Sequence, residues 1–342
     1  MNHWIAFVKK YRHYFIIGLL LIVGFFIARF ISGIDFRVLL KYLREMPEMM
    51  LRVLLVSFLG YLSASFAWML CLGDEMKKVS FVDIFIFRHV GEMLGAFNPT
   101  GVIAGDGLKA ACLHRKGVKE DTIFSSLLLY RALAILSSIF LIVLSVLFLS
   151  IGKINSGQSA FVILAGVAVL ALIATVLVMF LMHRNLYFGK LMEKMRRVTK
   201  WGLFSDKFIE SCYSVNKALS VYIRQHRNKF IGASLLSVLQ WVFGAMEFYI
   251  VLNALGVGVS LADAVSVEMG VVLFKMIGAV VPGQLGIEEL GNKVMLEAIG
   301  VVSNEVWLVV SIMRRARQLF WVLIAGVFSL MIMKTKQIKI RK

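Results

Sequence analysis

The stretch "MIGAVVPGQLGIEE", residues 276–289, places one proline, three glycines and two glutamates in a chain whose 342 residues are 60% hydrophobic. The whole chain has only three prolines. One is Pro282 in this stretch, and another is Pro99 in the similar stretch "MLGAFNPTG", residues 93–101. Because proline and glycine interrupt helices, both stretches are predicted to break a helix within apolar sequence.

The surrounding composition is that of a membrane protein. The mean hydropathy is +0.83, and an ordinary soluble domain has only about 45–50% apolar residues. Apolar runs long enough to cross a hydrocarbon core of about 30 Å recur along the chain. We therefore predict an all-α polytopic membrane protein with a single integral membrane domain, residues 1–342. About six full spans are predicted: 14–33, 53–73, 122–150, 158–182, 230–255 and 305–333.

The net charge of +18 is distributed unevenly between the predicted links. Residues 183–229 carry eleven lysines and arginines, whereas the links 151–157 and 256–263 carry only Lys153. This asymmetry is typical of the positive-inside rule. It predicts a multi-pass protein of the cytoplasmic (inner) membrane with both termini in the cytoplasm, and it argues against nucleic acid as a partner. The link 34–52 is placed outside by alternation alone.

Two further apolar stretches, 81–116 and 264–299, fit no full span. Each breaks at its Pro/Gly cluster and must begin and end on the same side of the membrane if the basic links are to stay inside. We predict two broken re-entrant helices, because irregular backbone at membrane depth occurs only where protein or a wet cavity surrounds it.

The two broken stretches also resemble each other when the sequence is shifted by 183 residues without a gap. Eight identities fall between residues 93 and 131, including Pro99 with Pro282 and Arg131 with Arg314. Three predicted spans separate the copies, so the second copy would be inverted, an arrangement typical of secondary transporters. A chance match of two apolar stretches is the alternative. The predicted organisation is two spans in 1–80, repeat 1 in 81–150, two spans and the basic loop 183–229 in 151–263, repeat 2 in 264–333, and a basic tail in 334–342.

Ionisable residues inside spans are rare and indicate function by default. Arg88 and Glu92 have the i,i+4 spacing of an ion pair. Glu92 is also equivalent to Lys275 in the repeat, and we hypothesise that Glu92 and Lys275 pair across the two repeats. The predicted substrate-binding residues are Glu92, Arg131, Glu268, Lys275, Glu288, Glu289, Arg314 and Arg315. The predicted helix-breaking residues are Gly95, Pro99, Gly101, Gly278, Pro282, Gly283 and Gly286.

Arg131 and Arg314 each lie about ten residues, or ~15 Å, inside a predicted span. A guanidinium group at that depth suits bidentate binding of phosphate, and the alternative is a side chain that extends to the interface. No nucleophile motif, nucleotide-binding loop or metal-spaced histidine pair is found in the sequence. We therefore expect no enzyme activity, cofactor or metal.

The motifs "GEMLGAFNPTGVIAGDGLKAACLHRKG" (91–117) and "GAVVPGQLGIEELGNKVMLEAIGV" (278–301), with Arg131 in the next span, resemble the lysylphosphatidylglycerol synthase/flippase transmembrane-region family. The resemblance covers about residues 10–335. Family members fused to an aminoacyl-transferase domain make a lysylated phospholipid and move it to the outer leaflet, and the membrane region is the translocating part. The resemblance therefore implies the flippase half, and we expect it without the synthase half.

Together these features predict a lipid translocase for a phospholipid or another phosphate-bearing lipid. The expected partners are membrane lipids: an anionic or aminoacylated phospholipid, or a polyprenyl phosphate sugar, with a separate lipid-modifying enzyme as a further partner. Two alternatives remain open. One is a secondary transporter of a small anionic solute, and the other is an accessory protein or transferase in lipid modification.

Overall fold

The computed structural model describes residues 36–97, 101–151, 220–278 and 281–340, with a few isolated positions between 190 and 217. These residues are helical apart from short links. The α-helices are α2 (Phe36–Cys71), α3 (Phe81–Phe97), α4 (Gly101–Arg115), α5 (Glu120–Ile151), α9 (Arg227–Ala254), α10 (Leu261–Ile277), α11 (Ile287–Ala298) and α12 (Asn304–Ile340), and the 3-10 helices are η1 (Gly73–Lys78) and η2 (Pro282–Gln284).

Four helices are long and apolar enough to cross a membrane. These segments are Met46–Cys71, Glu120–Leu149, Arg227–Ala254 and Asn304–Ile332. They confirm the predicted helical membrane class and coincide with four of the predicted spans. The predicted spans 14–33 and 158–182 lie outside the described residues, as does most of the basic loop 183–229.

The predicted link at 34–52 is helical, because α2 begins at Phe36 and continues through Pro47, and the candidate span begins at Met46. The charged residues of this segment were interpreted as a link. However, leucine, lysine, arginine and glutamate are all good helix formers, and Glu48 and Arg52 form an i,i+4 ion pair at 2.5 Å. The helix therefore extends beyond its apolar part. At the other end of the chain, α12 likewise continues into the predicted tail 334–342.

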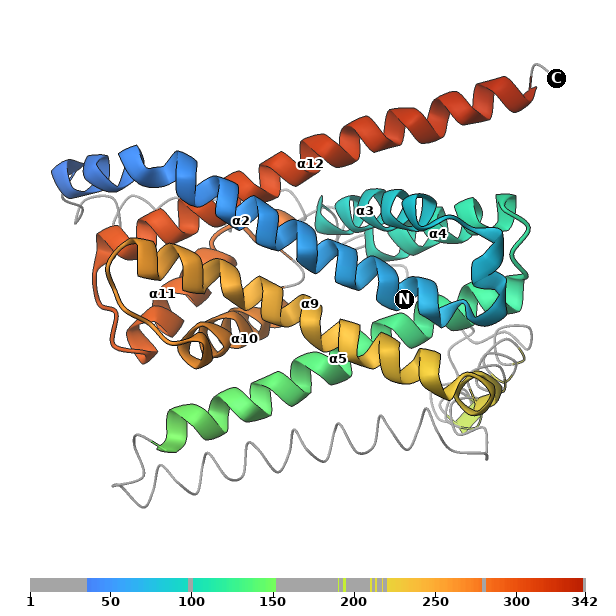
Figure 1. The fold of residues 1–342 in the computed structure, drawn as a ribbon, viewed down its shortest axis with the longest axis horizontal. Helices are drawn as coiled ribbons and strands as arrows, with labels where there is room; N and C mark the ends of the chain where they lie inside the picture. Colours follow the sequence, from blue (N-terminus) through green and yellow to red (C-terminus); the bar gives the residue numbers. More distant parts are fainter. Residues whose placement is uncertain are drawn as a thin grey trace, which may run out of the picture.

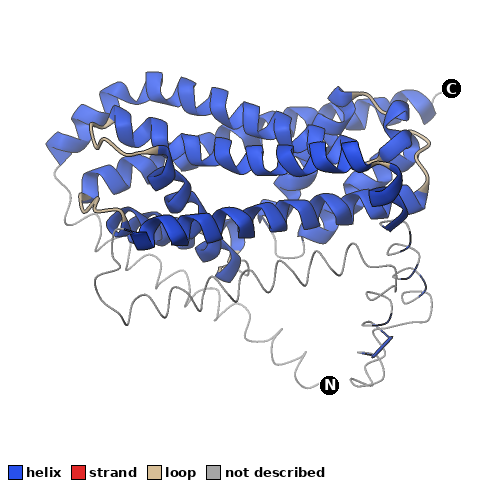
Figure 2. Cartoon of the chain, turned by 60° about the horizontal axis from the view of Figure 1, so that its bottom comes forward, coloured by secondary structure: helices blue, strands red, loops and turns tan. Residues whose placement is uncertain are grey.

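The four long helices run along the bundle, and the two broken stretches occupy opposite ends of it. In Figure 1, α3 and α4 lie at one end while α10 and α11 lie at the other. Figure 2 shows the same elongated, all-helical bundle from a second direction. Helices α2 and α9 pack along each other, and each broken stretch forms a hairpin, α3 with α4 and α10 with α11. The first hairpin packs into a core around Trp68 and Leu113, and the second into a core around Phe248 and Leu296.

The first hairpin depends on two glycines that bring α3 and α4 into close contact. A Cβ atom added to Gly105 would lie 2.2 Å from the backbone oxygen of Gly91. Helix α3 ends at Phe97 and α4 begins at Gly101, whereas Pro99 lies outside the described residues. Gly95 lies inside α3, so its prediction as a helix-breaking residue is wrong. A single glycine costs a helix only about 1 kcal/mol, which packing overrides.

The second hairpin breaks as predicted, between Ile277 and Ile287. Gly278 caps the end of α10, and Pro282 occupies the first turn of η2. Gly283 and Gly286 have φ of +63° and +80°, values that residues with a side chain rarely adopt. The break therefore requires glycine at both positions.

The two hairpins end alike. Gly117 follows α4 and Gly300 follows α11, both with positive φ. The next residue donates a hydrogen bond back into each helix, from Val118 to the carbonyl of Leu113 at 3.3 Å and from Val301 to that of Leu296 at 2.9 Å. These contacts form the same glycine C-cap, and they recur at the offset of 183 residues that aligns the two sequence stretches.

Candidate functional site: two buried charge clusters

The first charge cluster joins the first hairpin to α5, and we call it the Arg131 cluster: Glu92, Asp106, Lys109 and Arg131. Arg131 Nε donates a 2.6 Å hydrogen bond to Asp106 Oδ2. Lys109 Nζ contacts Glu92 and lies 3.3 Å from Asp106 Oδ1. Lys109 is only 2% exposed, whereas the Arg131 side chain is 36% exposed. The cluster therefore reaches from the protein interior to an accessible surface.

The second cluster joins the second hairpin to α9 and α12, and we call it the Arg314 cluster: Glu247, Glu268, Lys275, Glu288, Glu289, Arg314, Arg315 and Arg317. Arg314 lies at its centre. Its Nη1 donates to Glu268 Oε2 and its Nε to Glu288 Oε1, both at 2.9 Å. Its guanidinium also lies 3.6 Å from Glu247 Oε2 and 4.5 Å from the centre of the Phe248 ring.

Arg315 fastens α12 to the break in the second hairpin. It donates to both carboxylate oxygens of Glu289, at 2.5 and 3.0 Å. It also donates to the backbone carbonyls of Gly283 and Gln284 at 3.1 and 3.2 Å. Backbone carbonyl groups that a helix break leaves without helical partners need such donors. The role of Arg315 here is therefore to stabilise the broken backbone.

The Arg314 cluster is balanced in charge, with four carboxylates and four cations in mutual contact. Arg314 itself is 5% exposed and its donors go to carboxylates. The prediction that Arg314 binds a lipid phosphate is not tested by this arrangement. A phosphate would have to replace one of those carboxylates.

Two predicted ion pairs are wrong. Glu92 and Lys275 do not meet, because Glu92 contacts Lys109 within its own hairpin and Lys275 lies 3.9 Å from Glu288 in the other. Arg88 does not pair with Glu92 either, and its Nε donates to the hydroxyl of Tyr130 at 3.1 Å. In each hairpin, the returning helix supplies a nearer partner than the opposite hairpin does.

A line of side chains leads from the Arg314 cluster to Tyr130, the residue that precedes Arg131 on α5. Arg317 Nη1 donates to the hydroxyl of Tyr61 at 3.1 Å. The guanidinium of Arg88 lies 5.8 Å from the ring centres of both Tyr61 and Tyr130. Tyr130 in turn donates to Gln240 Oε1 at 3.2 Å. The polar path therefore runs from Arg317 on α12 through α2 and α3 to α5, between the two hairpins.

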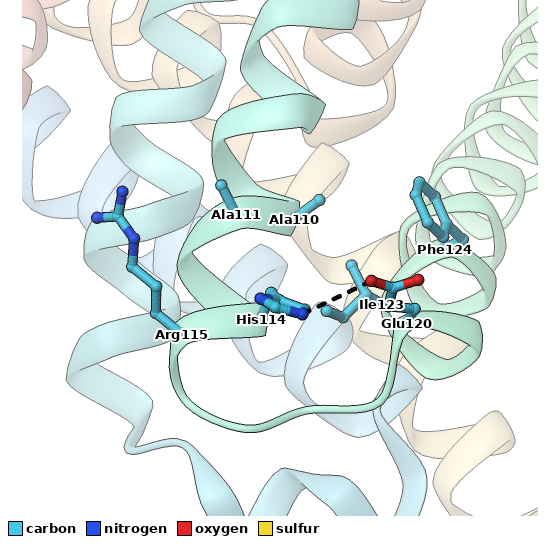
Figure 3. Close-up of a pocket in the computed structure, with 7 residues that line it drawn as sticks. All are labelled: Ala110, Ala111, His114, Arg115, Glu120, Ile123 and Phe124. Carbon is cyan, nitrogen blue, oxygen red and sulfur yellow. Dashed lines mark ion pairs between the residues drawn. The ribbon is translucent and has the colours of Figure 1, made fainter.

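A separate cavity of about 330 Å³ lies where α4 turns into α5. Figure 3 shows His114 and Glu120 facing each other across it, with Nε2 and Oε1 3.6 Å apart. Both side chains are mostly exposed. This cavity is distinct from the two clusters, and sequence analysis did not predict it.

Residues 15–326 match the model of the family described as "Lysylphosphatidylglycerol synthase TM region". The chain belongs to this family. A search of curated proteins gave no match. Membership confirms the resemblance inferred from the two motifs, and it identifies a multi-pass membrane protein of a family concerned with lipid handling.

The two charge clusters contain several buried polar residues that the sequence analysis did not predict as site residues. Lys109, Glu247 and Arg317 are at most 9% exposed. Each lies in a predicted span or re-entrant stretch, so a charge inside apolar sequence was the available signal. Among the described residues, no group of three or more histidine, cysteine, aspartate or glutamate side chains is placed to hold a metal ion.

Proposed function

We propose that the protein moves a phosphate-bearing lipid across the membrane, with the head group passing along the polar path between the two clusters. The observation that carries the proposal is Arg88. It is 9% exposed, and it forms no ion pair with any carboxylate in the described part of the chain. Glu92 interacts with its charge only from beyond ion-pair distance. A buried cation without a close counter-ion is costly in a membrane, and a phosphate group would neutralise it.

The charge count supports this reading. Arg88 and the Arg131 cluster together hold three cations against two carboxylates, whereas the Arg314 cluster is balanced. Guanidinium groups bind phosphate with paired, directional donors. The partly exposed Arg131 first contacts the head group, and Arg88 receives it in the interior. The acyl chains remain in the bilayer throughout.

The positions of the hairpins support an alternating mechanism. The hairpins lie at opposite ends of the bundle (Figure 1), and they share C-caps at an offset of 183 residues. We infer that they are inverted re-entrant repeats, which open the path to one side of the membrane at a time. The links 72–80 and 116–119 together carry four lysines and share the end of the bundle with α3 and α4. From the positive-inside rule we infer that this end faces the cytoplasm.

The test is a leaflet-accessibility assay in proteoliposomes. Labelled phosphatidylglycerol, its lysylated form and a polyprenyl phosphate sugar are compared with a lipid that lacks phosphate. We expect faster movement of at least one phosphate-bearing lipid, with the acceleration lost in Arg88→Gln and Arg131→Gln. Arg52→Gln is the matched control, because Arg52 forms an exposed ion pair with Glu48 within α2, away from both clusters.

The proposal fails if folded protein accelerates none of these lipids. The same vesicles then test the alternative function, through uptake of small labelled anions such as inorganic phosphate. Uptake that depends on Arg88 without lipid movement would identify a transporter of a small anionic solute.

A further inference from the structure

Glu247 is the least satisfied carboxylate of the Arg314 cluster. It lies about two turns before the end of α9 and is 4% exposed. Its Oε2 atom lies 3.0 Å from Arg317 Nε, yet neither of these two buried atoms makes a hydrogen bond. The contact has the distance of an ion pair without the alignment of a donor and an acceptor.

The neighbouring carboxylates are held better. Arg314 directs its aligned donors to Glu268 and Glu288, and Gln318 adds a 2.7 Å hydrogen bond to Glu288. Glu247 receives from Arg314 only the 3.6 Å charge contact. Hydrogen bonds stabilise a buried carboxylate ion, so Glu247 is the member whose negative charge has the least support.

The charged and titratable groups around Glu247 come from every side. Arg314 and Arg317 face it from α12, Glu268 from α10 and Glu288 from α11. From α2, Tyr61 contacts Arg317. Towards α5, Tyr130 contacts Gln240, two turns earlier on α9. Glu247 therefore has two negative and two positive neighbours. One added proton would change the net charge of this group of side chains.

We propose that Glu247 is a proton-binding site that couples protons to the passage of the phosphate-bearing head group. This inference rests on the proposed function. A hydronium ion gives a proton to Oε2 of Glu247: one O–H bond of the hydronium breaks, the O–H bond of the carboxyl group forms, and a water molecule is left. Arg317 then loses its counter-charge. Because Arg317 and Arg88 both contact Tyr61, two unpaired guanidinium groups then flank one ring and bind the phosphate together.

The cycle follows from the same charges. A phosphate head group is bound with the proton, because the proton removes the competing carboxylate from Arg317. When the proton leaves Glu247 on the other side of the membrane, the ion pair between Glu247 and Arg317 forms again and the head group is released. Lipid and proton therefore move in the same direction.

Infrared spectroscopy tests proton binding directly, without any transported substrate. Purified full-length protein in nanodiscs is titrated with acid, and the carbonyl stretch of a buried protonated carboxyl group is followed. We expect this band in wild type and in Glu48→Gln, an exposed control, and its loss in Glu247→Gln. Glu247→Asp retains a carboxyl group and should shift the band. This variant tests the inference even if Glu247→Gln does not fold. A band that is identical in all four proteins would overturn the inference.

Transport with an imposed pH gradient tests the coupling. With labelled phosphatidylglycerol in proteoliposomes, the wild-type rate should depend on pH, by at most about tenfold per pH unit for one proton. Glu247→Gln should show a rate independent of pH. Equal pH dependence in both proteins would refute coupling through Glu247. If wild type moves no lipid at any pH, the proposed function fails, and the infrared titration still decides whether Glu247 binds a proton.

Discussion

Arg314 on α12 donates a 2.9 Å hydrogen bond to Glu288 on α11, 26 residues earlier in the chain, and both residues are at most 5% exposed. This pair attaches the second hairpin to the last described span. It also places a positive charge among carboxylates from three other helices. The arrangement gives Arg314 a structural role whatever substrate the protein moves.

Replacing Arg314 should strongly destabilise the protein. Arg314→Gln leaves Glu247, Glu268 and Glu288 without their shared cation, and the loss of one partner from a buried ion pair costs about 3–5 kcal/mol. The free energy of unfolding in detergent measures this cost. The control is Arg52→Gln, whose exposed pair with Glu48 is worth about 0–1 kcal/mol. Similar losses in the two variants would contradict the buried network.

The contact between α3 and α4 predicts opposite outcomes for two glycines of α4. In Gly105→Ala, the new methyl group would collide with the backbone of Gly91, so the hairpin must separate at a cost of about 1–3 kcal/mol. In Gly107→Ala, no atom lies within 4 Å of the new methyl group, and alanine favours the helix by up to about 1 kcal/mol. Thermal unfolding of the two variants checks the prediction. Equal shifts in one direction would show that α3 and α4 do not pack at Gly105.

Sequence patterns predicted the elements of this fold better than the partners of its charges. The break at Pro282, Gly283 and Gly286 was predictable because those residues restrict the backbone locally. The partner of Glu92 was not, because it depends on how α3 and α4 face each other. The start of α2 was missed for a different reason, since charged residues that extend a helix beyond the membrane look the same in sequence as a polar link.

The residues of the candidate site also divide into those that the sequence predicts and those that depend on three-dimensional packing. Arg131 and Arg314 stood out because arginine is rare inside an apolar span. Glu247 offered the same signal within the predicted span 230–255, but it lies outside both repeated stretches. Its importance arises from contact with Arg317, which only the three-dimensional packing of α9 against α12 reveals.

Glu75 should make the stability of the bundle depend on acid. Its carboxylate accepts hydrogen bonds from Lys78 at 2.6 Å and from the backbone N–H of Lys119 at 3.2 Å. The hydrogen bond from Lys78 holds the pKa of Glu75 below its usual value of about 4.5. A carboxyl group with a lowered pKa in the folded state stabilises it above the unfolded pKa, and this contribution is lost as pH falls through the folded pKa.

Stability should therefore decrease as pH falls below about 4.5, and Glu75→Gln should show a smaller decrease. The pH dependence of the thermal midpoint measures both. Glu120→Gln serves as a comparison, because the Glu120 side chain is 73% exposed and lies beside His114. If Glu75→Gln loses as much stability at acidic pH as wild type does, the hydrogen bonds of Glu75 do not contribute to the acid dependence.

The hydroxyl of Tyr61 should matter for transport more than for stability. Tyr61→Phe removes the acceptor of the 3.1 Å hydrogen bond from Arg317 and leaves the ring beside Arg88. Loss of a hydrogen bond to a charged group costs about 1.5–3 kcal/mol at most, so the variant should still fold. Lipid movement should fall severalfold in the proteoliposome assay, because Arg317 is then no longer held towards Arg88.

Tyr249→Phe is the matched control, since Tyr249 lies on α9 and is 39% exposed. Its replacement should change neither stability nor transport. If Tyr61→Phe also transports at the wild-type rate, the line from Arg317 to Arg88 is not the path of the head group. The passage would then involve the Arg131 cluster alone, where Arg131 and Asp106 are already accessible.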